Sequence, residues 1–309
     1  MKRPSLVLLL ALLSVFVSQS SAEEPSSEAL ANLQKTFADY CGAHLVFNAK
    51  DLPEGTYHDI MPSLNDEGQL KAARLVLAEI RKLPPRYLDK VGLKSVGIFA
   101  ACVSRQGDGF RDFDERWKGY RYFGIYNGKN ALVAAYYNDA QLPGTLHHEV
   151  FHHIDATRKG ETKYTTEFVR DERFRRALSG TERYAALRLS EADLNALRKL
   201  GKGRILENAV GPYCEKNVGE DKAETARYLM ADLPDALVQM ATRSELTGSQ
   251  RLLHVLNKYQ QAAPDRLGPE WFLSVALGRA APLAAATVVP VPAPAPASTA
   301  ILGTGEGRR

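Results

Sequence analysis

The chain has 309 residues, 25% of them charged, with 40 Lys and Arg against 36 Asp and Glu and a net charge of +4. Four of the basic residues and one of the acidic residues lie outside positions 23–279, so this central part is nearly neutral. A nearly neutral body lacks the clustered positive face that nucleic-acid binding needs, so we expect no nucleic-acid partner. Its roughly 250 residues suffice for one large domain or two small lobes.

The first 22 residues have the layout of a secretory signal peptide. Two basic residues precede an apolar run over 6–17, and Ser20 and Ala22 supply the small residues required for cleavage after Ala22. The run is too short for an ordinary membrane span. We therefore expect a secreted or periplasmic protein that leaves the membrane once the signal is removed. The alternative is an uncleaved N-terminal anchor.

The elements that follow predict an α+β fold. Residues 27–40 and 67–83 have the helical spacing of apolar residues, and 96–103 read as a buried strand. Residues 120–137 contain two apolar runs around Asn127-Gly128-Lys129-Asn130, which predicts an edge hairpin. The rest of the chain, to Leu277, is mainly helical and charged. We expect one domain over 23–279, with a small mixed sheet up to about 143 and a mainly helical part over 144–279.

The stretch GTLHHEVFHHIDA, residues 144–156, contains four of the seven histidines of the chain. It follows a proline, and Thr145 can cap the exposed amides at the start of a helix. On such a helix Leu146, Val150 and Ile154 form one apolar stripe, and the polar residues lie on the other side. The sequence therefore predicts an amphipathic helix that begins near Thr145.

His148, Glu149 and His152 of this helix match the motif His-Glu-x-x-His. Two histidines four residues apart lie one helical turn apart, so both imidazoles can bind one zinc ion. In this motif the glutamate accepts a proton from the water that the metal activates. Alternatively, the histidines face solvent in a structural or interaction module, which predicts no tightly bound metal.

We expect different roles for three further polar residues of the helix. His147 and His153 do not share the face of the two ligands, so we expect a surface position or a supporting role outside the ligand set. Asp155 does share that face. It would orient a ligating histidine in a second shell, or simply lie near the end of the helix.

A catalytic zinc ion usually has three protein ligands, and the segment around residue 220 offers a third. Glu220 and Glu224 stand one helical turn apart, so Glu220 could bind the metal while Glu224 accepts the imidazole hydrogen of a ligating histidine. Alternatively, the two residues form an acidic first turn that complements the helix dipole. Spacing alone leaves both interpretations open.

HEVFHHID and the later pattern Tyr-x6-Glu-Asp-x-Ala-Glu together resemble the catalytic domain of the anthrax lethal factor-like and Pro-Pro endopeptidase metallopeptidases, which are gluzincins. The resemblance covers mainly residues 90–235. It implies a zincin-like fold, one zinc ion and endopeptidase activity on a polypeptide substrate. It also implies that Glu220 is the third zinc ligand and that Tyr213 assists at the transition state. Phe151 stands where the family often has a small residue, and the gap from His152 to Glu220 is long, which leaves the substrate open.

The same residues allow a second function, in which the zinc ion is structural or holds a partner without proteolysis. If the protein is a peptidase, the predicted hairpin offers an edge strand along which an extended substrate would lie. Both functions predict bound metal, so only peptide hydrolysis distinguishes them.

Two further features of the sequence are its three cysteines and its C-terminal segment. Cys41, Cys102 and Cys214 lie far apart without a CxxC spacing, which argues against a cysteine zinc site or redox pair. Cys41 and Cys102 are the candidate disulfide pair, with Cys214 as the odd thiol; the alternative is three reduced, buried cysteines. Residues 280–309 are rich in Ala and Pro and lack a periodic apolar face, so we expect a disordered tail.

Overall fold

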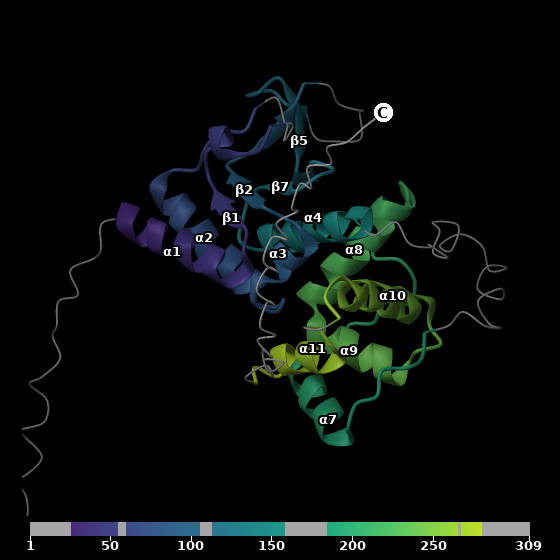
Figure 1. Cartoon of the computed structure of the whole chain (residues 1–309). Coiled ribbons are helices and arrows are strands. Elements are labelled where there is room, and N and C mark those ends of the chain that lie inside the picture. Colours follow the sequence, from purple (N-terminus) through teal and green to yellow (C-terminus); the bar gives the residue numbers. More distant parts are fainter. Residues whose placement is uncertain (1–25, 55–59, 106–112, 158–183, 265–266, 280–309) are drawn as a thin grey trace, which may run out of the picture.

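The computed structural model describes residues 26–54, 60–105, 113–157, 184–264 and 267–279 (Figure 1). The predicted signal peptide over 1–22 and the predicted tail over 280–309 lie outside these ranges. Within them, no helix is both long enough and apolar enough to cross a membrane. Export and the behaviour of the tail therefore stay predictions.

The N-terminal half contains both helices and strands. Its helices are α1 (Ser26–Cys41), α2 (Asp66–Ile80) and α3 (Tyr87–Val91), with a short 3-10 turn, η1 (Ala49–Asp51). Its strands are β1 (His44–Val46), β2 (Ser95–Phe99), β3 (Cys102–Ser104), β4 (Phe113–Asp114), β5 (Gly119–Tyr122), β6 (Gly124–Tyr126) and β7 (Ala131–Ala135). The two helices predicted over 27–40 and 67–83 are thus confirmed as α1 and α2. Asn65 begins α2 because its side chain accepts a hydrogen bond from the Gly68 amide.

The main sheet has the strand order β1-β2-β7-β6. β1, β2 and β7 run parallel, and β6 pairs antiparallel with β7 and forms one edge. The predicted hairpin is confirmed by β6 and β7: the side chain of Asn127 accepts hydrogen bonds from three backbone amides of the turn, and Gly128 adopts a φ of 76°. The sheet is therefore mixed, with its antiparallel strand at the edge.

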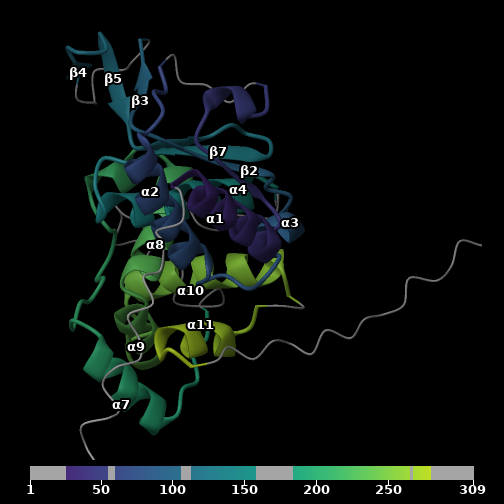
Figure 2. The ribbon, with the colours of Figure 1, turned by 90° about the vertical axis from the view of Figure 1, so that its left-hand side faces the viewer.

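A second, antiparallel sheet has the order β3-β5-β4 and projects from the body (Figure 2). The single strand predicted over 96–103 is wrong, because the chain leaves the main sheet after Phe99 and β3 joins the second sheet. The chain returns to the main sheet between Tyr122 and Gly124, where β5 ends and β6 begins. The first transition starts from the interior strand β2, and the second leads into the edge strand β6.

The histidine-rich segment forms α4 (Gln141–Thr157), which packs against β6 and β7 and against α2. It begins four residues before the predicted start, so the prediction that Thr145 caps the helix is wrong. Asn138 takes that place, since its side chain accepts hydrogen bonds from the amides of Ala140 and Gln141. Pro143 is tolerated inside the helix because the amides of the first turn have no partner within the helix.

The C-terminal half is mainly helical, as predicted. It contains α7 (Glu191–Leu200), η2 (Pro212–Glu215), α8 (Val218–Ala231), α9 (Leu233–Thr242), α10 (Thr247–Ala262) and α11 (Pro269–Ala276). In Figure 2 the main sheet lies above α4, α8 lies below it, and α10, α11, α9 and α7 follow in turn. A continuous apolar core joins both halves, and α8 is the helix that packs most extensively on α4. This packing brings two distant segments of the chain together.

The three cysteines are buried and free, so the predicted pairing of Cys41 with Cys102 is wrong. Cys41 belongs to the main core, whereas Cys102 packs in a separate apolar cluster with Phe99 on the other side of the sheet. Burial raises the pKa of the Cys41 thiol to about 11. The alternative of three reduced, buried cysteines therefore describes the structure.

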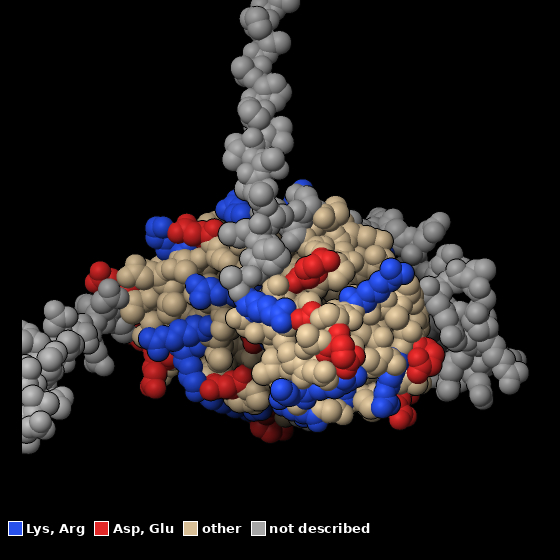
Figure 3. Space-filling model, turned by 90° about the horizontal axis from the view of Figure 1, so that it is seen from below, with Lys and Arg blue, Asp and Glu red and all other residues tan. Residues whose placement is uncertain are grey.

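Charged side chains of both signs lie interspersed over the face of the molecule seen from below (Figure 3). This face therefore presents both signs of charge to solvent.

Candidate metal centre

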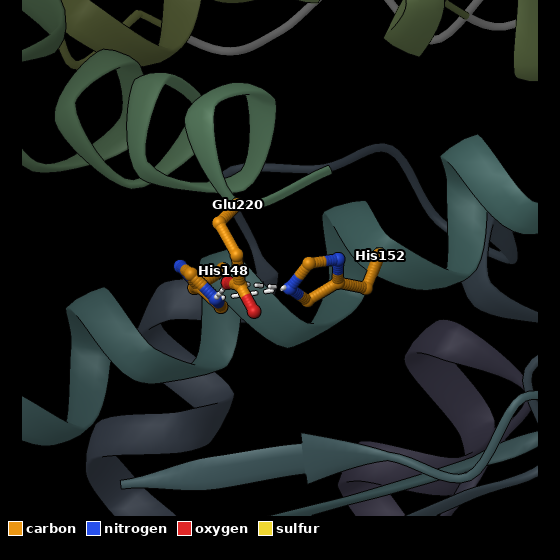
Figure 4. A group of neighbouring side chains, drawn as sticks. All are labelled: His148, His152 and Glu220. Carbon is orange, nitrogen blue, oxygen red and sulfur yellow. Dashed lines mark hydrogen bonds and ion pairs between the residues drawn. The ribbon is translucent and has the colours of Figure 1, made fainter. Parts of the chain in front are cut away.

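Helix α4 presents two histidines on the side that faces α8. Leu146, Val150 and Ile154 are fully buried and hold the opposite side of the helix in the core. His148 and His152, one turn apart, lie together under the first turn of α8 (Figure 4). The apolar stripe thus sets the rotation of α4 that directs both imidazoles toward α8.

Helix α8 supplies the third side chain, Glu220, from its first turn. The helix begins here because the side chain of Asn217 accepts a hydrogen bond from the Glu220 amide. This start places Glu220 over α4, with its carboxylate between the two imidazoles (Figure 4). A residue 68 positions after His152 thereby joins the histidine pair.

Three potential ligand atoms converge at this point. Nε2 of His148 lies 3.0 Å from Oε2 of Glu220 and 3.0 Å from Nε2 of His152, and Nε2 of His152 lies 3.2 Å from Oε2 of Glu220. In a tetrahedral zinc site with bonds of about 2.0–2.1 Å, ligand atoms are about 3.3 Å apart. Unprotonated imidazole nitrogens and a carboxylate oxygen all offer lone pairs, which a cation between them would satisfy. The three side chains could therefore hold a metal ion.

The group is largely enclosed. The side chains of His148, His152 and Glu220 are 10%, 23% and 15% exposed, so His152 is the most open to solvent. Burial alone would lower the pKa of His148, but hydrogen bonds with Glu220 and Glu224 outweigh it and raise the pKa to about 9. Burial alone would likewise raise the pKa of Glu220, but the two imidazoles hold it well below its usual range. The site therefore favours a negative carboxylate beside a cation.

Glu224 lies behind His148, one turn along α8 from Glu220. Its Oε1 is 2.9 Å from Nδ1 of His148, the ring nitrogen that faces away from the ligand group. Its other oxygen contacts the guanidinium of Arg227. These contacts fix the orientation of the His148 ring and direct Nε2 toward Glu220.

Glu149 is 5% exposed and lies against the edge strand β6. It is next to His148 in the chain, and its charge acts on the buried Cys102 thiol. The structure thus places this carboxylate between α4 and the sheet edge, close to the ligand group in sequence but outside it.

Tyr213 reaches the centre from η2. Its ring centroid lies 6.2 Å from that of His148, and the side chain is 41% exposed. Lys216 lies over the same ring, with its ammonium 5.5 Å from the centroid. The structure therefore brings the predicted tyrosine beside the histidine pair, at the solvent-exposed side of the site.

Asp155 has a different partner from the one that its position on the helix suggests. Both of its carboxylate oxygens accept hydrogen bonds from the ammonium of Lys222, at 3.1 and 3.0 Å. Lys222 is buried and follows the first turn of α8, two residues after Glu220. Asp155 thus contacts α8 through Lys222 rather than through a ligating imidazole.

His147 and His153 are buried, so the expected surface position is wrong for both. Nε2 of His147 lies 3.0 Å from the Glu79 carboxylate on α2, and Nε2 of His153 lies 2.8 Å from the carbonyl oxygen of Val91. These partners come from elements distant in the chain, which no local pattern reveals. Both histidines anchor the sides of α4 that face away from the ligand group.

Sequence reasoning also missed the contacts that hold the first turn of α8. Asp221 is fully buried and pairs with the guanidinium of Arg251 on α10, which is also fully buried. Asp221 thus joins α8 to α10, and Lys222 joins it to α4 through Asp155. The only available signal was the run of charged residues after Gly219, which is also typical of an exposed helix start.

Comparisons with protein-family models, with curated proteins and with solved structures give no match for this chain.

Proposed function

We propose that this protein is a zinc-dependent endopeptidase, with zinc held by His148, His152 and Glu220. The observation that carries the proposal is the convergence of two ligand atoms from α4, which also carries Glu149, with a third from Glu220 on α8. Two histidines and one glutamate are a typical ligand set for catalytic zinc, which keeps one position open for water or substrate. In this proposal the sheet, α4 and α8 form a zincin-like arrangement.

When bound, zinc would supply a Lewis acid that polarises a peptide carbonyl and makes a water molecule more acidic. Glu149 would accept the proton of the attacking water and pass it to the leaving amine. The Tyr213 hydroxyl would donate a hydrogen bond to the oxyanion that develops on the carbonyl. Glu224 would hold the His148 ring in place through Nδ1.

An extended polypeptide would lie along β6, which is the edge of the main sheet in the described residues. Glu149 lies against this strand, so a peptide beside β6 would pass close to the proposed base. The same edge contains Phe123, an exposed aromatic residue between β5 and β6. These features support a polypeptide as the substrate class.

The experiment compares metal content and hydrolysis in one preparation. The purified chain should contain about one zinc ion, and a peptide library analysed by mass spectrometry should show cleavage that a chelator abolishes and zinc restores. Glu149→Gln should keep the metal and lose hydrolysis, because the ligands survive while the base does not. Glu191→Gln, the same change on the exposed helix α7, is the matched control and should keep both.

Two outcomes would contradict the proposal. Metal without cleavage by the parent chain would favour a structural or partner-binding zinc domain. Full activity of Glu149→Gln would remove the assigned base even if the parent is a peptidase.

A further inference from the structure

Gly124 is the first residue of β6 and occupies a position where a side chain has no room. It pairs with Ala134 of β7, and its missing side chain would point toward α4. A Cβ at this position would lie 2.8 Å from Cγ and 2.8 Å from Oε1 of Glu149, and 2.8 Å from Cγ2 of Thr145. Such distances are shorter than carbon atoms tolerate, so the Glu149 carboxylate occupies the space that any other residue would fill.

The backbone conformation at position 124 does not require glycine. The residue lies in a regular strand and is not among the glycines with positive φ. The reason therefore lies in its neighbours.

Gly97 on β2 provides an informative comparison within the same sheet. A Cβ there would also be crowded, with its nearest atoms in the apolar side chains of Phe99, Leu52 and Val133. Glycine at position 97 thus serves core packing. At position 124, two of the three nearest atoms belong to the proposed base.

We propose that Gly124 is a positioning residue, whose missing side chain lets the Glu149 carboxylate lie against the edge strand. This inference rests on the proposed peptidase function, because it assigns Gly124 a part in placing the base. A longer residue would rotate the Glu149 side chain away from β6. The base would then be displaced from the strand along which the substrate lies.

The stability cost and the functional cost of such a change differ. Glu149 has a flexible side chain with several rotamers, so the clash with an alanine methyl can be relieved by rotation of that side chain. A displacement of about 1 Å in a reacting group can nevertheless lower turnover about 100-fold. Gly124→Ala should therefore impair chemistry much more than folding.

The test measures zinc content, thermal midpoint, kcat and KM of the full chain with Gly124→Ala. We expect full zinc content, a midpoint within about 3 °C of the parent, an unchanged KM and a kcat that is lower by about 100-fold. Gly97→Ala is the matched control, which should lower the thermal midpoint and leave kcat unchanged. Thr145→Ser in the Gly124→Ala background removes Cγ2 and should recover part of the lost kcat, whereas Thr145→Ser alone should change kcat less than twofold.

An unchanged kcat of Gly124→Ala would overturn the inference, as would a loss that appears only in KM or in stability. Crystal structures of the zinc-loaded parent and of Gly124→Ala provide a readout independent of activity. The Glu149 carboxylate should move away from β6 in the variant, and an unmoved carboxylate contradicts the inference. Absence of hydrolysis by the parent chain would instead contradict the proposed function, while the displacement of Glu149 still decides the role of Gly124.

Discussion

Oε1 of Glu224 lies 2.9 Å from Nδ1 of His148, on the side of the imidazole opposite the ligand group. Burial alone would raise the pKa of Glu224, but the contacts with His148 and Arg227 outweigh it and lower the pKa. The carboxylate is therefore negative at neutral pH and accepts the Nδ1 hydrogen. A metal ion would displace the proton from Nε2 of His148, while Glu224 would keep the remaining hydrogen on Nδ1.

Glu224→Ala should weaken zinc binding by about 10- to 100-fold, because the His148 ring loses the partner that fixes its tautomer. Competition with a chromophoric chelator measures the affinity at constant pH. Glu245→Ala, at an exposed site before α10, is the matched control and should bind zinc like the parent. Equal affinities of Glu224→Ala and the parent would contradict the role of Glu224.

Glu220→Ala should remove most of the zinc at neutral pH, since only two protein ligands remain. The same chelator competition separates Glu220 from Asp155, the other carboxylate on the face of the histidines. Asp155 contacts Lys222, so Asp155→Ala should leave a buried ammonium without this partner and lower stability more than metal affinity. Retention of zinc by Glu220→Ala together with its release by Asp155→Ala would show that one helix holds the metal.

Tyr213→Phe should keep zinc and the fold but lower kcat by about 100-fold, the cost of losing one donor to a developing oxyanion. The change removes only the hydroxyl, and the ring next to His148 remains. Steady-state kinetics on a peptide found in the library measure kcat and KM. Tyr126→Phe, on the face of β6 that contacts His153, is the control and should retain kcat. Normal turnover of Tyr213→Phe would remove the tyrosine from the mechanism.

The metal-free protein should lose the stabilising contribution of Glu79 as the pH falls from 5 toward 2. Burial alone would raise its pKa, but the contacts with His147 and Lys82 outweigh it and lower the pKa to about 2. A carboxyl whose pKa is lower in the folded state stabilises the protein above its unfolded pKa of about 4.3, and this contribution is lost as the pH falls toward the folded value.

Urea unfolding of the metal-free parent and of Glu79→Gln over this pH range provides the measurement. The difference between the two proteins should be largest above pH 5 and should shrink toward pH 2. A difference that stays constant over the range would contradict the assignment.

The features that the sequence predicted correctly depend on local spacing. The hairpin around Asn127 and Gly128 forms because a short turn needs the chemistry of these two residues, and they are adjacent. His148 and His152 lie together because any helix places residues four apart on one face. Both predictions needed only residues that lie close together in the sequence.

The features that the sequence missed depend on the contacts of distant elements. The burial of His147 and His153 follows from the positions of Glu79 on α2 and Val91 at the end of α3. The interpretation of Glu220 stayed open because an acidic first turn is typical both of a metal ligand and of a solvated helix start. Packing of α8 on α4 places Glu220 beside the two histidines, and no local pattern reveals this packing.

A metal ion in this centre would also act as a cross-link. It would join α4 to α8 through residues 68 positions apart in the chain, and closure of such a loop reduces the entropy of the unfolded state. Disulfides supply this constraint in many proteins, whereas the cysteines of this chain are free. In the proposed enzyme, resistance to unfolding would therefore follow the supply of metal rather than the redox state of the surroundings.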